Sequence, residues 1–401
     1  MYKSELFYSL LLSLIFALRM FGVFIISPLL PVYISGFTSE NNYILIGFSL
    51  GVYSLVQCFM QLPFGILSDK YGRKPMIIIG LIIFIIGLII SIFSKNIYIL
   101  IISRIIQGIG VVSSTLMALL IDLTSKKNYF RVMSIVGFFV GLSFAISLIS
   151  SNFLFSYVGI AGIFLIIAFL SLISLLLIIF FVPSVPFIAK KKTISLKKII
   201  FNKELFKLNF GVFVLYFSQI FFFIIFPRIL SICTNVLEMY FWKLYLPVVI
   251  LSFLFLLPVF FFGGRLISYK MICNIFIFIL FLIQIGFIIF FKFFSDNLNL
   301  LALLFLMFMT VFNFIEAFQR SLVSKIAPKS YKGSVMGIYS SFQSFGLFLG
   351  GLLGGIYSTF KLKNIIYIYI LFSFLTFFWF IFFINIKKIS SKKKKKKEKI
   401  L

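Results

Sequence analysis

The sequence predicts an all-α membrane protein in which twelve transmembrane helices form two six-helix bundles. First, hydrophobic residues make up 62% of the 401 residues, charged residues only 11%, and the mean hydropathy is +1.21; a soluble domain carries about 25% charged residues. Second, twelve apolar runs each reach the roughly 20 residues that a membrane-spanning helix needs. Third, one long basic interval, 183–206, divides these runs six and six.

The apolar runs are too long and too continuous for the alternating strands of a membrane barrel, so each is expected to be a helix. The first six cover 6–32, 44–64, 75–94, 98–121, 132–156 and 160–182. The second six cover 207–227, 243–262, 271–291, 299–321, 333–359 and 365–386. The expected organisation is therefore a first bundle (1–182), a basic central loop (183–206), a second bundle (207–386) and a lysine-rich tail (387–401).

The net charge of +28 has a topological explanation. If the N-terminus is inside, 28 of the 37 Lys and Arg residues fall in inner segments and five in outer loops. Such an excess marks the cytoplasmic side, so both termini are expected there, and no nucleic-acid partner is expected. The Lys392–Lys397 tail has two interpretations, a contact with anionic lipid headgroups or a solvated chain end.

Several kinds of chemistry have no candidate residues in this sequence. It contains no histidine, and Cys58, Cys233 and Cys273 lie far apart without metal-ligand spacing. It also lacks a phosphate-binding Gly-rich loop and a Gly-x-Ser-x-Gly nucleophile turn. We therefore expect no metal, no cofactor, no catalytic residue and no enzyme activity, and any proton-carrying side chain must be a carboxylate.

The most specific motif lies between the second and third runs and reads Gly65-Ile-Leu-Ser-Asp69-Lys-Tyr-Gly72-Arg73-Lys74. A tight turn between helices needs glycine where the backbone bends or approaches another helix. Asp69 is suited to face the positive N-terminal end of a neighbouring helix. An ordinary basic loop is the alternative, but it would not need this spacing of glycine, aspartate and arginine.

This loop resembles the signature loop of the major facilitator superfamily, and Arg104-Ile-Ile-Gln107-Gly108-Ile-Gly110 resembles a second motif of that family. Similarity to its proton-driven efflux transporters extends over nearly the whole chain, including Met117–Thr124 and Tyr331–Ser340, with no soluble domain expected after the lysines. The resemblance implies a monomeric transporter of a bacterial inner membrane. It would export an apolar or amphipathic small molecule by proton-coupled alternating access.

The resemblance also implies a conformational latch at the cytoplasmic face. Asp69 would form a charge cluster with Arg73 and Asp122 near the start of the eleventh run, and Arg131 is a candidate fourth member. Gly65 and Gly72 would shape the loop. Carboxylate–guanidinium pairs beside a helix N-terminus can stabilise one arrangement of two bundles, and a few kcal/mol is enough to bias such an equilibrium.

Charged residues inside membrane spans are costly and usually functional. Arg19 and Arg104 both fall in the outer half of their runs and are expected to face one polar cavity; pairing with backbone carbonyls or snorkelling is the alternative. Glu316 is the one carboxylate placed clearly inside a run, which makes it the leading proton-coupling candidate. An i,i+4 salt bridge with Arg320 that only neutralises both charges is the alternative.

Polar residues at helical spacing are candidates for the substrate cavity, because amides are costly against lipid. Hydrogen bonding between helices without substrate contact is the alternative. The candidates are Tyr53, Gln57, Gln61, Tyr216, Gln219, Asn313, Tyr339 and Gln343.

Two other functions are compatible with these sequence patterns. The chain could import or facilitate the passage of a metabolite such as a sugar or an amino acid. It could also be a non-transporting membrane scaffold or receptor. The intramembrane charges Arg19, Arg104 and Glu316 argue against the scaffold, because such a protein would gain nothing from charges in lipid.

Overall fold

The computed structural model describes residues 3–35, 43–183, 202–234, 246–255, 269–294, 297–357 and 362–384. Within these ranges, eleven helices are long and apolar enough to cross a membrane, and the shorter apolar helix Leu246–Phe255 falls in the predicted span 243–262. The same residues contain no strand. The predicted all-α membrane fold is confirmed. The tail 387–401 and most of the central loop lie outside the described residues.

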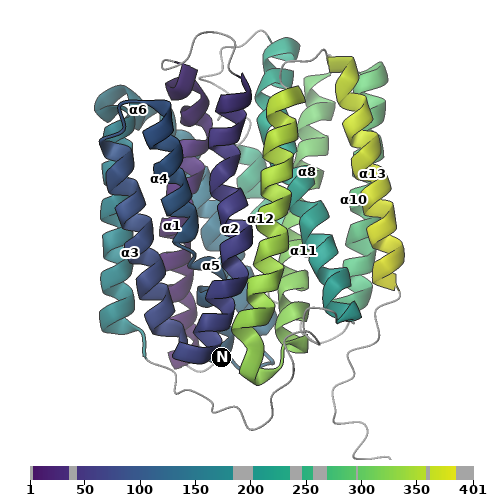
Figure 1. Ribbon diagram of the computed structural model, residues 1–401. Helices are drawn as coiled ribbons and strands as arrows, with labels where there is room; N and C mark the ends of the chain where they lie inside the picture. The colour runs from purple at the N-terminus through teal and green to yellow at the C-terminus, as the bar shows by residue number, and fades with distance from the viewer. Residues whose placement is uncertain are drawn as a thin grey trace, which may run out of the picture.

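Two groups of helices lie side by side (Figure 1). The first contains α1 (Lys3–Ser35), α2 (Tyr43–Tyr71), α3 (Arg73–Ile92), α4 (Ile97–Ile109), α5 (Ser113–Asp122) and α6 (Tyr129–Phe181). The second contains α8 (Lys203–Thr234), the helix Leu246–Phe255, α10 (Tyr269–Phe293), α11 (Leu298–Ile326), α12 (Lys332–Tyr357) and α13 (Leu362–Ile384). The start of α1 and the end of α13 lie at the same end of the molecule, here called the N-terminal end.

Two spans depart from simple straight helices. The predicted fourth span is divided into α4 and α5 by the non-helical residues Gly110–Val112. In contrast, α6 contains both the predicted fifth and sixth spans, which are joined at Gly159 with φ 63° and ψ −175°. This backbone conformation is open to glycine and costly for other residues, so glycine permits the abrupt connection.

Replacing Gly159 with alanine should lower the free energy of unfolding by about 1–3 kcal/mol, because a side chain is strained at this φ and ψ. A Cβ atom at Gly159 would meet no atom within 4 Å, so the effect comes from the backbone alone. Thermal unfolding in detergent measures it. Gly351→Ala is the control, since this helical glycine also has open surroundings. Equal melting temperatures for the two variants would contradict the prediction.

Polar side chains form hydrogen bonds with the free backbone groups at several helix ends. Asn96, Asn202 and Asn297 accept backbone N–H bonds at the starts of α4, α8 and α11, which supplies partners that a helix start otherwise lacks. At helix ends, Lys74 Nζ donates to the carbonyls of Ile179 and Val182 in 2.8 and 2.7 Å bonds. Lys74, at the start of α3, therefore joins this helix to the end of α6 in the same bundle.

The two bundles meet along α2 with α12, α5 with α12, and α6 with α11. Figure 1 shows α2 and α12 running side by side through the middle of the molecule. Near the N-terminal end, Phe130 of α6 stacks on Phe318 of α11 with ring centroids 4.4 Å apart. One continuous cluster of buried apolar side chains includes residues of both bundles. The structure is thus closed between the bundles at this end.

Candidate functional site

Asp69, near the end of α2, contacts the first residues of α12 across the bundle interface. Its carboxylate accepts hydrogen bonds from the backbone N–H groups of Gly333 (2.9 Å) and Ser334 (2.6 Å), and from the Ser334 hydroxyl (2.5 Å). The side chain is 2% exposed. A buried carboxylate at a helix N-terminus satisfies backbone donors and interacts favourably with the helix dipole. Asp69 therefore joins the second bundle to the first.

Three more charges surround this contact. Arg73 Nη1 lies 2.6 Å from Asp69, and Arg73 Nε lies 3.0 Å from Asp122 at the end of α5. Lys332, the first residue of α12, approaches Asp122 to 2.8 Å and also donates to the carbonyl of Ile121. Positive and negative groups therefore alternate across the interface. We refer to Asp69, Arg73, Asp122, Lys332 and Ser334 as the closing cluster.

The sequence interpretation of this cluster was incomplete in two respects. Arg131 is exposed and makes none of the ion pairs found in the described part of the chain. Lys332 and Ser334, in contrast, were not singled out as cluster residues. Their position at the start of the eleventh run was the available signal, because the resemblance places the loop aspartate there.

Glycines allow α2 and α12 to approach at the closing cluster. A Cβ atom on Gly65 would overlap the carbonyl oxygen of Gly333, and one on Gly337 would lie 2.7 Å from the carbonyl oxygen of Gln61. Gly72 has a different role, because its φ of 101° forms the turn that separates α2 from α3. The lack of a side chain at Gly65 thus allows α2 and α12 to lie close together, whereas at Gly72 it allows the backbone to adopt a positive φ.

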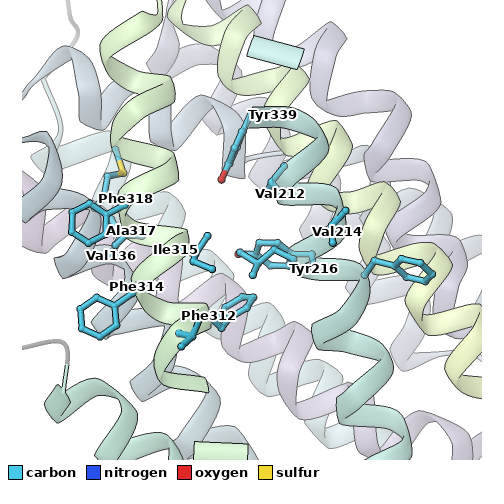
Figure 2. Close-up of a cluster of buried hydrophobic side chains, with 14 of the residues drawn as sticks. Val136, Val212, Val214, Tyr216, Phe312, Phe314, Ile315, Ala317, Phe318 and Tyr339 are labelled. Carbon is cyan, nitrogen blue, oxygen red and sulfur yellow. The ribbon is translucent and has the colours of Figure 1, made fainter. Parts of the chain in front are cut away.

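In the second bundle, Glu316 lies in a buried polar cluster between α11 and α8. Its carboxylate pairs with Arg320 Nη2 at 2.6 Å and accepts a short hydrogen bond from the Tyr216 hydroxyl. Arg320 also donates to the Tyr216 oxygen at 3.1 Å. Figure 2 shows the hydroxyl groups of Tyr216 and Tyr339 pointing into the same space beside α11. The i,i+4 salt bridge exists, and Tyr216 extends it to a second helix.

A small pocket adjoins Glu316 where α6, α11 and the helix Leu246–Phe255 meet. Gly137 leaves open space in it, whereas the Phe253 ring occupies the place of a Cβ atom at Gly141. Asn313 donates to the Ser252 hydroxyl at 3.0 Å. The pocket combines residues of both bundles, and its lining consists of Met133, Gly137, Phe253, Asn313, Glu316, Ala317 and Arg320.

Other predicted cavity residues form a polar network inside the first bundle. Gln57 donates to the Tyr53 hydroxyl at 2.9 Å. The Arg104 guanidinium lies over the Tyr53 ring, 4.7 Å from its centroid, and donates to Gln107 at 2.9 Å. The two hydrogen bonds lie within α2 and within α4, and the contact of Arg104 with the Tyr53 ring joins these two helices of the first bundle.

Arg19 and Arg104 have different partners, although they were expected to face one cavity. Arg19 is 1% exposed, lies over the Phe84 ring at 5.0 Å, and donates to the carbonyl of Gly110 at 3.0 Å. Gln61 donates to the Ser113 hydroxyl at 2.7 Å. Both contacts are at the break between α4 and α5.

The remaining candidates for the substrate cavity are less deeply buried. Gln219 and Gln343 are half-buried on α8 and α12. Gly346, Gly350 and Gly354 form a stripe of glycines on α12 that packs against α8 in the same bundle. A Cβ atom on Gly346 would lie 2.6 Å from the carbonyl oxygen of Phe213. Close packing therefore accounts for this stripe.

Known proteins are similar to this chain in sequence and in fold. A family model described as Major Facilitator Superfamily matches residues 12–351 and 317–401. The chain belongs to the major facilitator superfamily. The solved structure of a proton:xylose symporter of this superfamily, XylE, superposes with a TM-score of 0.80, covers 96% of each chain and is 13% identical. At this identity, the likeness shows the shared fold.

Sequence relatives within the superfamily are bacterial transporters. An uncharacterized transporter of Buchnera aphidicola subsp. Acyrthosiphon pisum is 38% identical over 86% of this chain and 89% of its own length. The inner membrane transport protein YajR of Escherichia coli K12 is 33% identical over 86% of this chain and 76% of its own length. A class H tetracycline resistance protein of Pasteurella multocida is 34% identical over 33% of this chain and 34% of its own length. The chain is therefore a multi-pass membrane transporter and not an enzyme.

Proposed function

We propose that this superfamily member exports an apolar or amphipathic small molecule across a bacterial inner membrane, driven by protons. Both termini would be cytoplasmic, as the distribution of Lys and Arg favours. One chain supplies both bundles, so the transport unit is proposed to be a monomer. The observation that carries the proposal is the position of Glu316, a carboxylate at a pocket between the bundles.

The surroundings of Glu316 suit a group that exchanges a proton for substrate. Its partners are Arg320 and the Tyr216 hydroxyl, so the carboxylate interacts with α11 and α8 at once. Protonation would weaken the pairing with Arg320 and leave a buried guanidinium without a counter-charge. The proton would therefore change the relative stability of two arrangements around this pocket, which is the requirement for coupling.

The pocket lining favours an apolar or amphipathic substrate over a sugar. Met133, Phe253, Ala317 and Gly137 present apolar surface, and Asn313 is bonded to Ser252. A sugar site would need several free donors and acceptors for the hydroxyl groups. Kinship with a tetracycline resistance protein over a third of the chain supports export, whereas XylE is named as a symporter. Metabolite import is therefore the second candidate.

The closing cluster would hold the cytoplasmic end shut while the other end admits or releases solutes. Release of Asp69 from the start of α12 would let α2 and α12 separate. Because an α2–α12 contact joins the two bundles, its opening and closing would alternate access to the pocket.

In proteoliposomes with an imposed pH gradient, Glu316→Gln should abolish the gradient-dependent flux of a transported solute. The neutral amide has nearly the same shape but cannot carry the proton. A panel of dyes, drugs and sugars identifies the solute with native protein. Glu316→Asp should retain a response to the gradient, because it keeps the carboxyl group.

The matched control is Glu204→Gln, which removes a carboxylate paired with Lys207 at the start of α8. It should leave the pH response unchanged. Undiminished gradient-driven flux in Glu316→Gln would refute the role of Glu316. A native protein that moves no solute in response to the gradient would refute proton coupling itself.

A further inference from the structure

The break between α4 and α5 places a helix N-terminus inside the first bundle. Residues 110–112 interrupt the span Ile97–Asp122 about midway, and α5 begins at Ser113. The first N–H groups of a helix lack intrahelical carbonyl partners and carry a partial positive charge. Non-helical backbone at membrane depth is tolerated where it is buried in protein or lines a cavity. The start of α5 is thus suited to an anion.

A cationic side chain with unused donors adjoins this helix start. Arg19 donates through Nη2 to Gly110, three residues before Ser113. Its Nε and Nη1 atoms are buried and have no hydrogen-bond partner in the described part of the chain. The side chain is 1% exposed, and one face of its guanidinium lies against Phe84. The hydrogen bond to the end of α4 therefore uses only one of the three guanidinium nitrogen atoms of Arg19.

No protein carboxylate neutralises this arginine among the described residues. Each of the five described carboxylates contacts another group: Glu5 binds Ser125 and Asn128, Asp69 and Asp122 belong to the closing cluster, Glu204 pairs with Lys207, and Glu316 pairs with Arg320. A buried charge without a counter-charge is strongly unfavourable, and arginine does not lose its proton in proteins. A bound anion would remove this cost.

The start of α5 offers further donors and lies beside the bundle interface. The Ser114 hydroxyl is buried and has no partner among the described residues. Ser113 receives a bond from Gln61, and the Gln61 carbonyl is in close contact with Gly337 of α12. Separation of α2 from α12 would therefore open a route toward Ser113 and Ser114.

We propose that Arg19, Ser114 and the N-terminus of α5 bind the acid group of the transported molecule, which makes the substrate an amphipathic organic anion. The substrate class rests on the proposed export function. The anion site itself does not, because it follows from the unpartnered donors of Arg19 and Ser114. The apolar part of the substrate would extend toward the bundle interface.

Equilibrium binding to the purified full chain in detergent tests this site without a pH gradient. The probes are 1-naphthoate, 1-naphthalenemethanol and 1-naphthylmethylammonium, which share one ring system and differ in charge. Native protein should bind naphthoate about tenfold or more tightly than either other probe, as a charge-assisted hydrogen bond provides. Arg19→Gln should abolish this preference, and Arg19→Lys should restore part of it.

Two further measurements keep the test decisive. Ser114→Ala should weaken naphthoate binding several-fold, whereas the exposed control Arg131→Gln should bind as native protein does. If Arg19→Gln does not fold, Arg19→Lys and Ser114→Ala carry the test. Equal binding of the three probes to native protein would overturn the proposal, as would an unchanged preference in folded Arg19→Gln. Competitive displacement of naphthoate by equimolar chloride would assign the site to an inorganic anion and overturn the substrate class.

Loss of binding and loss of transport are distinguishable outcomes. Native protein that binds naphthoate selectively but shows no gradient-driven flux would contradict proton coupling and support the anion site. Native protein that transports a neutral solute and does not prefer naphthoate would support the transporter and overturn the anion site.

Discussion

Asp69→Asn is expected to reduce transport to near background, because it removes the charge that joins α2 to the start of α12. The carboxylate accepts three hydrogen bonds from Gly333 and Ser334 and pairs with Arg73. Asparagine would place its side-chain NH2 group, itself a hydrogen-bond donor, against at least one of the groups that donate to Asp69. Breaking a buried charge pair on one side costs about 3–5 kcal/mol. The closed arrangement would lose about two to four orders of magnitude in relative population.

Hydrogen–deuterium exchange reports this opening directly. The amides of Gly333 and Ser334 are donors to Asp69, so their exchange should accelerate about 100-fold or more in Asp69→Asn. Glu5→Gln is a matched control at the same end of the molecule. Glu5 binds Ser125 and Asn128 within the first bundle, and its loss should leave exchange at α12 unchanged. Unaltered exchange in Asp69→Asn would show that the closing cluster does not hold α12.

Alanine at Gly65 or Gly333 is expected to prevent closure by sterics alone. A Cβ atom at Gly65 overlaps the Gly333 carbonyl oxygen, and one at Gly333 overlaps the Gly65 carbonyl oxygen as well as the Arg73 and Ser68 side chains. Relief requires α2 and α12 to move apart, because backbone atoms cannot rotate away. Overpacking of this kind typically costs about 1–3 kcal/mol, and here it destabilises only the closed arrangement. Transport should fall by about five-fold to a hundred-fold.

Flux measurements with a melting curve separate this effect from misfolding. The clash lies between bundles, so each variant should melt within a few degrees of native protein while transport fails. Gly351→Ala is the control on α12, because a Cβ atom there meets nothing within 4 Å. Full transport activity in both Gly65→Ala and Gly333→Ala would refute the requirement for close approach of these helices.

The long apolar runs made most of the fold predictable. Every predicted span except the divided fourth coincides, fully or in its described part, with a continuous apolar helix, because only a helix satisfies backbone polar groups across a hydrocarbon layer. Glycine motifs also carried local information, since Gly72 occupies a positive φ that other residues rarely adopt. The division of the fourth span at Gly110–Val112 was not predicted, because its apolar pattern continues through the break.

The candidate site could be predicted only by residue type. Arg19, Arg104 and Glu316 were recognised because a charged side chain inside a membrane span is energetically costly and usually functional. Hydropathy does not indicate which residues these side chains contact. The fold paired Glu316 with Tyr216 a hundred residues away and joined Lys332 to Asp122, while Arg131 remained exposed. Such contacts depend on how helices pack against one another, which the sequence near each residue does not encode.

The sequence by itself determined that this chain crosses a membrane many times and carries the motifs of a transporter. Those properties follow from local composition and spacing, since each span satisfies its own backbone and each turn needs its own glycine. Only the tertiary structure decided which charges neutralise one another and which do not. Ion pairing acts over a few ångströms between helices distant in the chain, so packing paired Lys332 with Asp122 and left two nitrogen atoms of Arg19 without a partner in the described part of the protein.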